Sequence, residues 1–315
     1  MNKTKNTFKS SNKTNDIAYY VYTPDMPVRA VVQISHGMVE HIERYEDFAS
    51  FLCEKGIAVC GNDHVGHGAS SASDDWGFFG DGGIATLVSD IDILNGIMKK
   101  KYPSVPYILL GHSMGSFIAR KYITVYGEHI DGVIISGTSG GNVPLGAGIF
   151  LTSLIGALRG KRYRSTMVEK IAMGSYNKRF PNEGKYAWLT RDEKIREAYA
   201  ADPRCTFSFT VGAYNEMFKL LREISSSDWA QKVPKGLPVF LASGRDDPVG
   251  DYGKGFEIVR DFLRDAELCT LKCKLYDNCR HEILNETNRD EVYADFLEFI
   301  DEVYEGVIEE RQMGF

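Results

Sequence analysis

The chain has 315 residues, of which 43% are hydrophobic and 25% are charged, as in ordinary globular proteins. This length allows one domain with a large insertion as readily as two smaller domains. The formal net charge of -6 gives no electrostatic reason to expect nucleic acid as a partner.

The N-terminal region gives no targeting signal. The first 16 residues are polar and basic, without the apolar run of a signal peptide. Nowhere do 18 apolar residues follow one another, so we expect no segment to span a membrane. Six cysteines are few for this length and indicate reduced thiols. These features together predict a cytoplasmic protein.

Apolar runs alternate with helical patterns up to residue 137. Four runs are continuously apolar: 30–35, 57–61, 107–110 and 133–136. Helical patterns cover residues 43–55, 84–101 and 114–126. An earlier, alternating run covers residues 17–22. Continuous runs are typical of strands covered on both faces, and the rhythm indicates a parallel sheet with crossover helices. The alternating run predicts an antiparallel strand at the edge of the sheet.

The strand rhythm stops at about residue 140 and resumes at about residue 233. The later elements are expected strands at 239–242 and 269–276 and expected helices at 251–264 and 289–308. We therefore predict an α/β core formed by residues 1–140 and 233–315. A helical lid insertion, residues 141–232, interrupts it.

The first candidate catalytic residue is Ser113. Residues 107–115 read YILLGHSMG, which is a G-x-S-x-G turn between an expected strand and an expected helix. Such a turn exposes the serine at the helix N-terminus, where the Met114 backbone N–H can stabilise an oxyanion. The neighbouring His112 is expected to face away and pack in the core.

A second oxyanion donor should follow an early strand. The run 30–35 ends in His36-Gly37-Met38, which makes the Met38 N–H the candidate and places Gly37 beside the substrate. A plain glycine turn is the alternative.

The base must follow the nucleophile along the chain. Among the seven histidines only His281 lies beyond the insertion, in a short loop after the last expected strand. The acid should follow the preceding strand, where Asp246 and Asp247 are adjacent. The order of residues alone leaves both aspartates open.

We expect neither a metal nor another cofactor. His64 and His67 lie in a glycine-rich turn without a third ligand nearby, and Cys269 and Cys273 are expected on the apolar face of a strand. Neither G-x-G-x-x-G nor a phosphate-binding loop is present.

Three motifs resemble the monoglyceride lipase and lysophospholipase branch of the α/β-hydrolases, which also contains serine aminopeptidase-like members. They are HGMVEHIERY at 36–45, DHVGHGAS at 63–70 and GHSMG at 111–115. The resemblance implies a mostly parallel sheet flanked by helices, with a helical lid. It also implies a G-x-x-D pattern at 244–247, which selects Asp247 as the acid. Ser116 departs from the family's second glycine, and the insertion matches only weakly, chiefly at Asp202-Pro203.

The insertion is rich in large apolar residues. Phe150, Leu151, Leu154, Ile155 and Leu158 repeat at helical spacing, followed by Arg159, Lys161, Arg162 and Arg164. Phe150 and Leu154 are candidate substrate-binding residues. The stripe favours either transient docking on an anionic lipid surface or packing on the core.

These features predict a serine hydrolase that cleaves carboxylic esters, with Ser113, His281 and Asp247 as its triad. The expected substrate is a small acyl ester of the monoacylglycerol or lysophospholipid type, and no specific protein partner can be inferred. The same triad could instead cleave amides, as in a peptidase. A third alternative is a ligand-binding receptor without turnover.

Overall fold

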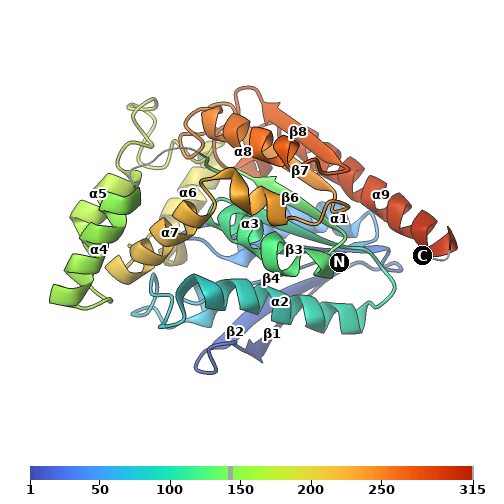
Figure 1. Ribbon diagram of the computed structural model, residues 1–315, viewed down its shortest axis with the longest axis horizontal. Coiled ribbons are helices and arrows are strands. Elements are labelled where there is room, and N and C mark those ends of the chain that lie inside the picture. The colour runs from blue at the N-terminus through green and yellow to red at the C-terminus, as the bar shows by residue number, and fades with distance from the viewer. Residues whose placement is uncertain (141–144, 314–315) are drawn as a thin grey trace.

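A twisted sheet of eight strands forms the centre of the computed structural model, which describes residues 1–140 and 145–313 (Figure 1). The strands are β1 (Asn2–Lys9), β2 (Asp16–Thr23), β3 (Ala30–Ser35), β4 (Ile57–Asn62), β5 (Tyr107–His112), β6 (Gly132–Ser136), β7 (Val239–Gly244) and β8 (Leu271–Tyr276). Their order is β1-β2-β4-β3-β5-β6-β7-β8. All pairs from β4 to β8 are parallel, whereas β1 and β2 are antiparallel. This arrangement confirms the predicted α/β-hydrolase architecture.

Helices cover both faces of the sheet. One face carries α2 (Gly83–Lys101), α3 (Met114–Tyr126) and α8 (Lys254–Asp265), and the other carries α1 (Glu46–Cys53) and α9 (Arg289–Met313). Successive strand residues enter opposite cores: Val31 packs with the first set of helices and Val32 with the second. This two-sided burial explains why the central strands read as continuous apolar runs.

The N-terminal segment differs from the prediction. Residues 2–9, where the sequence predicted no strand, form β1 and pair with β2 along their whole length. Hence β2 is not the edge strand. Most side chains of β1 are exposed, so backbone bonding to β2 defines this strand and no apolar alternation signals it.

The opposite edge also differs in detail. Strand β8 begins at Leu271, two residues later than expected, and Cys269 and Cys273 are exposed. The alternation in this segment therefore does not mark a buried face. As an edge strand with a single neighbour, β7, it is only partly covered.

The segment between β6 and β7 is helical, as expected. It contains α4 (Leu145–Arg159), α5 (Thr166–Met173), α6 (Glu193–Ala201), α7 (Val211–Glu223) and the short 3-10 helices η4 (Pro203–Cys205) and η5 (Ser227–Lys232). The predicted boundary at residue 141 and the predicted end at 315 lie outside the described residues. No helix within 1–140 or 145–313 combines the length and apolar character needed to cross a bilayer.

Candidate active site

Ser113 lies at the tip of a tight turn between β5 and α3. Its backbone has φ 55° and ψ -121°, a conformation that costs energy for a non-glycine residue. The turn requires Gly115, because a Cβ there would lie 1.9 Å from the Ser35 carbonyl oxygen of β3. The glycines of the motif thus let α3 begin directly against the sheet and raise Ser113 above it.

Two backbone N–H groups in segments next to Ser113 have no protein acceptor within the described residues. Within the described residues, neither the Met38 nor the Met114 amide makes a hydrogen bond, whereas Val39 N–H donates to His67 Nε2 at 3.3 Å. The oxyanion loop, as residues 36–41 are called here, lies against Ser113: a Cβ on Gly37 would lie 3.0 Å from Ser113 Cβ. Two free donors beside a serine are the arrangement that stabilises an oxyanion.

His281 and Asp247 form a buried pair. The imidazole Nδ1 lies 2.9 Å from Asp247 Oδ2, and Val249, two residues after the aspartate, donates its N–H to Asp247 Oδ1 at 2.8 Å. Both side chains of the pair are at most 2% exposed. Asp246 makes no side-chain hydrogen bond in the described part of the chain, so of the two adjacent aspartates only Asp247 contacts His281 there.

The Asp247 carboxylate sets the basicity of His281. Burial alone would lower the pKa of His281, but attraction to Asp247 and the hydrogen bond between them outweigh burial and raise it. Ser113 Oγ makes no hydrogen bond to His281 among the described residues. Such bonds to a catalytic base commonly tighten only when substrate binds.

Two aromatic rings that the sequence analysis did not assign to the site pack against His281. Trp188, from the insertion, has its ring centre 5.2 Å from the imidazole, and His112 has its centre 4.7 Å away. The expectation that His112 faces away is therefore wrong. Burial, and then the nearby His281, lower the pKa of His112 to about 4, so it is neutral near pH 7.

Two histidines of the N-terminal motifs, His36 and His67, accept hydrogen bonds from backbone N–H groups. His64 N–H donates to His36 Nε2 at 3.0 Å, and Asp63 accepts from the N–H groups of Ile42 and Ala69 at 3.0 and 2.7 Å. Together with the hydrogen bond from Val39 N–H to His67, these contacts attach segment 63–70 to the oxyanion loop.

A buried ion-pair network joins the oxyanion loop to the base loop, defined here as residues 280–286. Arg44 contacts Glu40 at 2.7 Å and Glu282 through two 2.7 Å bonds. Burial alone would raise the pKa of Glu40, but Arg44 holds it down at about 2. Glu40 in turn accepts from Gly37 N–H and from the Tyr45 hydroxyl. The HGMVEHIERY motif contains Glu40 and Arg44, but only the structure reveals their partner Glu282.

The candidate substrate-binding residues fall in two places. Gly37 lies against Ser113, as described above. Phe150 and Leu154 are 70% and 46% exposed on α4, so in this conformation both side chains face outward.

Comparison with known proteins places the chain in a family. Residues 26–288 match the family described as serine aminopeptidase, S33. The chain belongs to this family of α/β-hydrolases. A crystal structure of a thermostable carboxyl esterase from Bacillus coagulans is similar to this hydrolase, with 31% identity, a TM-score of 0.90 and coverage of 96% of this chain and 99% of that one.

Two relatives that match most of the hydrolase carry lipase names. The monoglyceride lipase homolog of Monkeypox virus is 27% identical over 88% of this chain and 91% of its own length. The monoacylglycerol lipase of Mycolicibacterium smegmatis is 27% identical over 90% of this chain and 92% of its own length. These relatives confirm the expected resemblance to the monoglyceride lipase branch.

Proposed function

We propose that this hydrolase cleaves monoacylglycerol-type esters through an acyl-enzyme on Ser113. Three observations together carry the proposal: Ser113 lies in a strained turn with Gly37 against it, the Met38 and Met114 N–H groups make no hydrogen bond in the described residues, and His281 and Asp247 form a buried pair. The lipase and esterase names of the relatives support an ester, and a lipid ester, as the substrate.

Each group has a distinct role in the proposed reaction. Ser113 Oγ attacks the ester carbonyl while His281 Nε2 accepts its proton, and the Met38 and Met114 amides stabilise the oxyanion. His281 then returns the proton to the departing alcohol. Water, activated by the same imidazole, attacks the acyl-enzyme and releases the fatty acid. Asp247 fixes the tautomer of His281 through Nδ1 and stabilises the imidazolium.

We also propose that α4 docks the hydrolase transiently on a lipid surface. Only part of this helix packs inward: Leu145 and Thr152 are buried, and Thr152 Oγ1 accepts a hydrogen bond from Asn215 of α7 at 2.9 Å. Its apolar residues Phe150 and Leu158 are 70% and 74% exposed, and Arg159 follows them. An exposed apolar face beside basic side chains suits binding to an anionic interface.

The proposed substrate is tested by fatty-acid release from a long-chain monoacylglycerol and a lysophospholipid, in parallel with cleavage of an aminoacyl amide. The Ser113→Ala variant is the blank. We expect the monoacylglycerol to be cleaved with the highest kcat/KM and Ser113→Ala to be inactive. A higher rate on the amide would mean that the hydrolase is an aminopeptidase.

Docking by α4 is tested by comparing hydrolysis on vesicles with hydrolysis in buffer. The double change Phe150→Ser and Leu158→Ser should lower the rate on monoacylglycerol in anionic vesicles several-fold, since the apolar anchor is lost. It should leave the rate on a short-chain ester in buffer unchanged. Val125→Ser, at another exposed apolar position (56% exposed), is the matched control. Equal losses on both substrates would contradict docking by α4.

A further inference from the structure

Residues 183–205, called here the bridge segment, belong to the insertion yet bond to both catalytic loops. Toward the base loop, Glu282 N–H donates to the Leu189 carbonyl at 2.7 Å, and Arg191 Nε donates to the fully buried Glu286 at 2.9 Å. By contrast, α4 and α5 carry exposed apolar residues and lie at the periphery (Figure 1). The insertion therefore has a firmly attached part and an exposed part.

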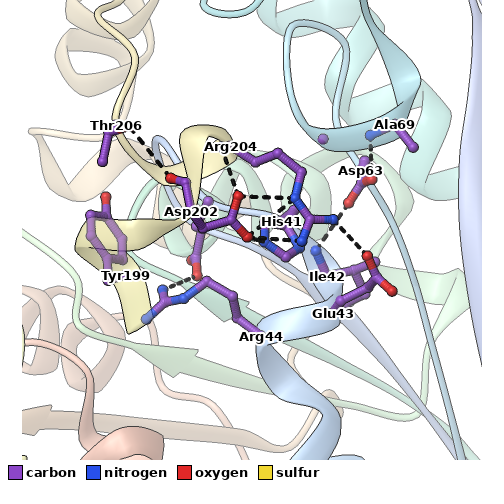
Figure 2. A network of polar contacts seen from close by, with 12 residues as sticks. His41, Ile42, Glu43, Arg44, Asp63, Ala69, Tyr199, Asp202, Arg204 and Thr206 are labelled. Atoms are coloured by element: carbon purple, nitrogen blue, oxygen red, sulfur yellow. Dashed lines mark hydrogen bonds and ion pairs between the residues drawn. The ribbon is translucent and has the colours of Figure 1, made fainter. Parts of the chain in front are cut away.

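Toward the oxyanion loop, the bridge segment makes a cluster of polar contacts around His41 (Figure 2). His41 Nε2 lies 3.1 Å from Asp202 Oδ2, and Arg204 bonds both Asp202, at 2.8 Å, and Glu43, at 2.7 Å. Cys205 brings a thiol close enough to form a set of three metal-ligating groups with His41 and Asp202. We interpret the cluster as an ion-pair link instead, because Arg204 already occupies both oxygens of Asp202.

The most telling contact of the bridge segment is the one to Val39. Val39 has φ 58°, which is a genuine outlier for a β-branched residue and persists only where the surroundings enforce it. Two bonds hold it: its N–H donates to His67, and its carbonyl accepts from the Tyr199 hydroxyl of α6 at 2.9 Å. Burial raises the pKa of Tyr199 well above its ordinary value, so the hydroxyl stays protonated and donates.

These bonds fix the peptides around the candidate oxyanion donor. Gly37 N–H is held by Glu40 on one side of Met38, and Val39 is held by His67 and Tyr199 on the other. Met38 N–H is left unbonded between them, in the part of the chain that the structure describes. The carbonyl of the same peptide, that of Gly37, lies 2.8 Å from His36 Nδ1. The direction of the Met38 N–H therefore depends on His36 and on the two contacts that hold Val39, one of which the insertion supplies.

We propose that Tyr199 is a positioning residue that keeps the Met38 amide aimed at the oxyanion, so that the bridge segment is a fixed part of the active site. The inference rests on the proposed ester hydrolysis at Ser113. The inference divides the predicted lid into two parts. The bridge segment stays fixed, and only the other residues of the insertion can move during turnover.

The test compares Tyr199→Phe with Tyr186→Phe. Tyr186 packs against Tyr199 with ring centres 4.9 Å apart, but its hydroxyl has no hydrogen bond among the described residues. The steady-state rates are normalised to active sites titrated with a fluorophosphonate. We expect Tyr199→Phe to lower kcat roughly 10- to 100-fold on a p-nitrophenyl ester and on a monoacylglycerol alike, with KM within about threefold. Tyr186→Phe should match the wild type.

A second readout separates positioning from a merely structural role. A trifluoromethyl ketone forms a tetrahedral adduct with the serine, so its inhibition constant should rise in Tyr199→Phe by about the factor lost from kcat. The inference would be overturned if Tyr199→Phe kept the kcat and the inhibition constant of the wild type. It would also be overturned if kcat fell only on the monoacylglycerol, because Tyr199 would then recognise the alcohol part of the substrate. Failure of the wild type to hydrolyse either ester would instead overturn the proposed function.

Discussion

At the scale of single residues, His281 and its carboxylate partner determine how activity depends on pH. The base must be neutral to accept the proton of Ser113, and Asp247 raises the pKa of His281 above its ordinary value of 6.5 against the effect of burial. Activity should therefore decline as the pH falls through an apparent pKa above 6.5. A pH profile of kcat/KM on a short-chain ester measures this limb.

Removing the carboxylate should change this profile in a defined direction. In Asp247→Asn, burial still lowers the pKa of His281, and the largest attraction that opposed burial is gone, so the acidic limb should move to lower pH. The maximal kcat should fall by about 10³- to 10⁴-fold because the tautomer is no longer fixed. Asp246→Asn is the matched control and should leave limb and rate unchanged. A damaging Asp246→Asn would mean that Asp246, and not Asp247, is the acid.

At the scale of elements, Arg120 on α3 ties together the two ends of the insertion. It is fully buried, donates to the carbonyls of Ser139 at 2.7 Å and of Ile224 at 2.5 Å, and stacks 4.4 Å from the centre of the Trp229 ring. In the described residues it has no carboxylate partner, and burial lowers its pKa to about 9. Ser139 follows β6 and Ile224 ends α7, so this one side chain spans the junction of core and insertion.

We expect Arg120→Met to destabilise the fold, because it leaves the buried carbonyl of Ile224 and the partly buried carbonyl of Ser139 without this donor. The free energy of unfolding in urea, followed by tryptophan fluorescence, should fall by about 2–4 kcal/mol. Lys121→Met is the control, since Lys121 pairs with Glu223 at the exposed surface and should contribute less than about 1 kcal/mol. Equal stability of Arg120→Met and the wild type would contradict this role.

The sequence predicted the elements that repeat a simple pattern and missed those that depend on distant partners. The buried strands are continuously apolar, so their positions could be predicted, and the elbow at 111–115 is a local motif. Strand β1 has no apolar pattern because pairing with β2 alone defines it. Tyr199 lies 160 residues from Val39, so no local pattern could connect them.

At the scale of the whole molecule, the candidate catalytic groups come from segments spread over the chain and lie at the carboxyl ends of the parallel strands. Met38 follows β3, Ser113 follows β5, and Asp247 follows β7, all of them parallel strands whose carboxyl ends point the same way. The carboxyl ends of such strands are the usual ligand-binding position in open α/β sheets. The bridge segment then joins the oxyanion and base loops from outside the sheet.

The central claim, ester hydrolysis through Ser113, is tested most directly by locating the covalent intermediate. The hydrolase is labelled with an alkyl fluorophosphonate, digested and analysed by mass spectrometry. We predict one adduct per chain, on Ser113, with parallel loss of monoacylglycerol hydrolysis, and no adduct on Ser113→Ala. An adduct on another residue, or undiminished hydrolysis by Ser113→Ala, would contradict the account.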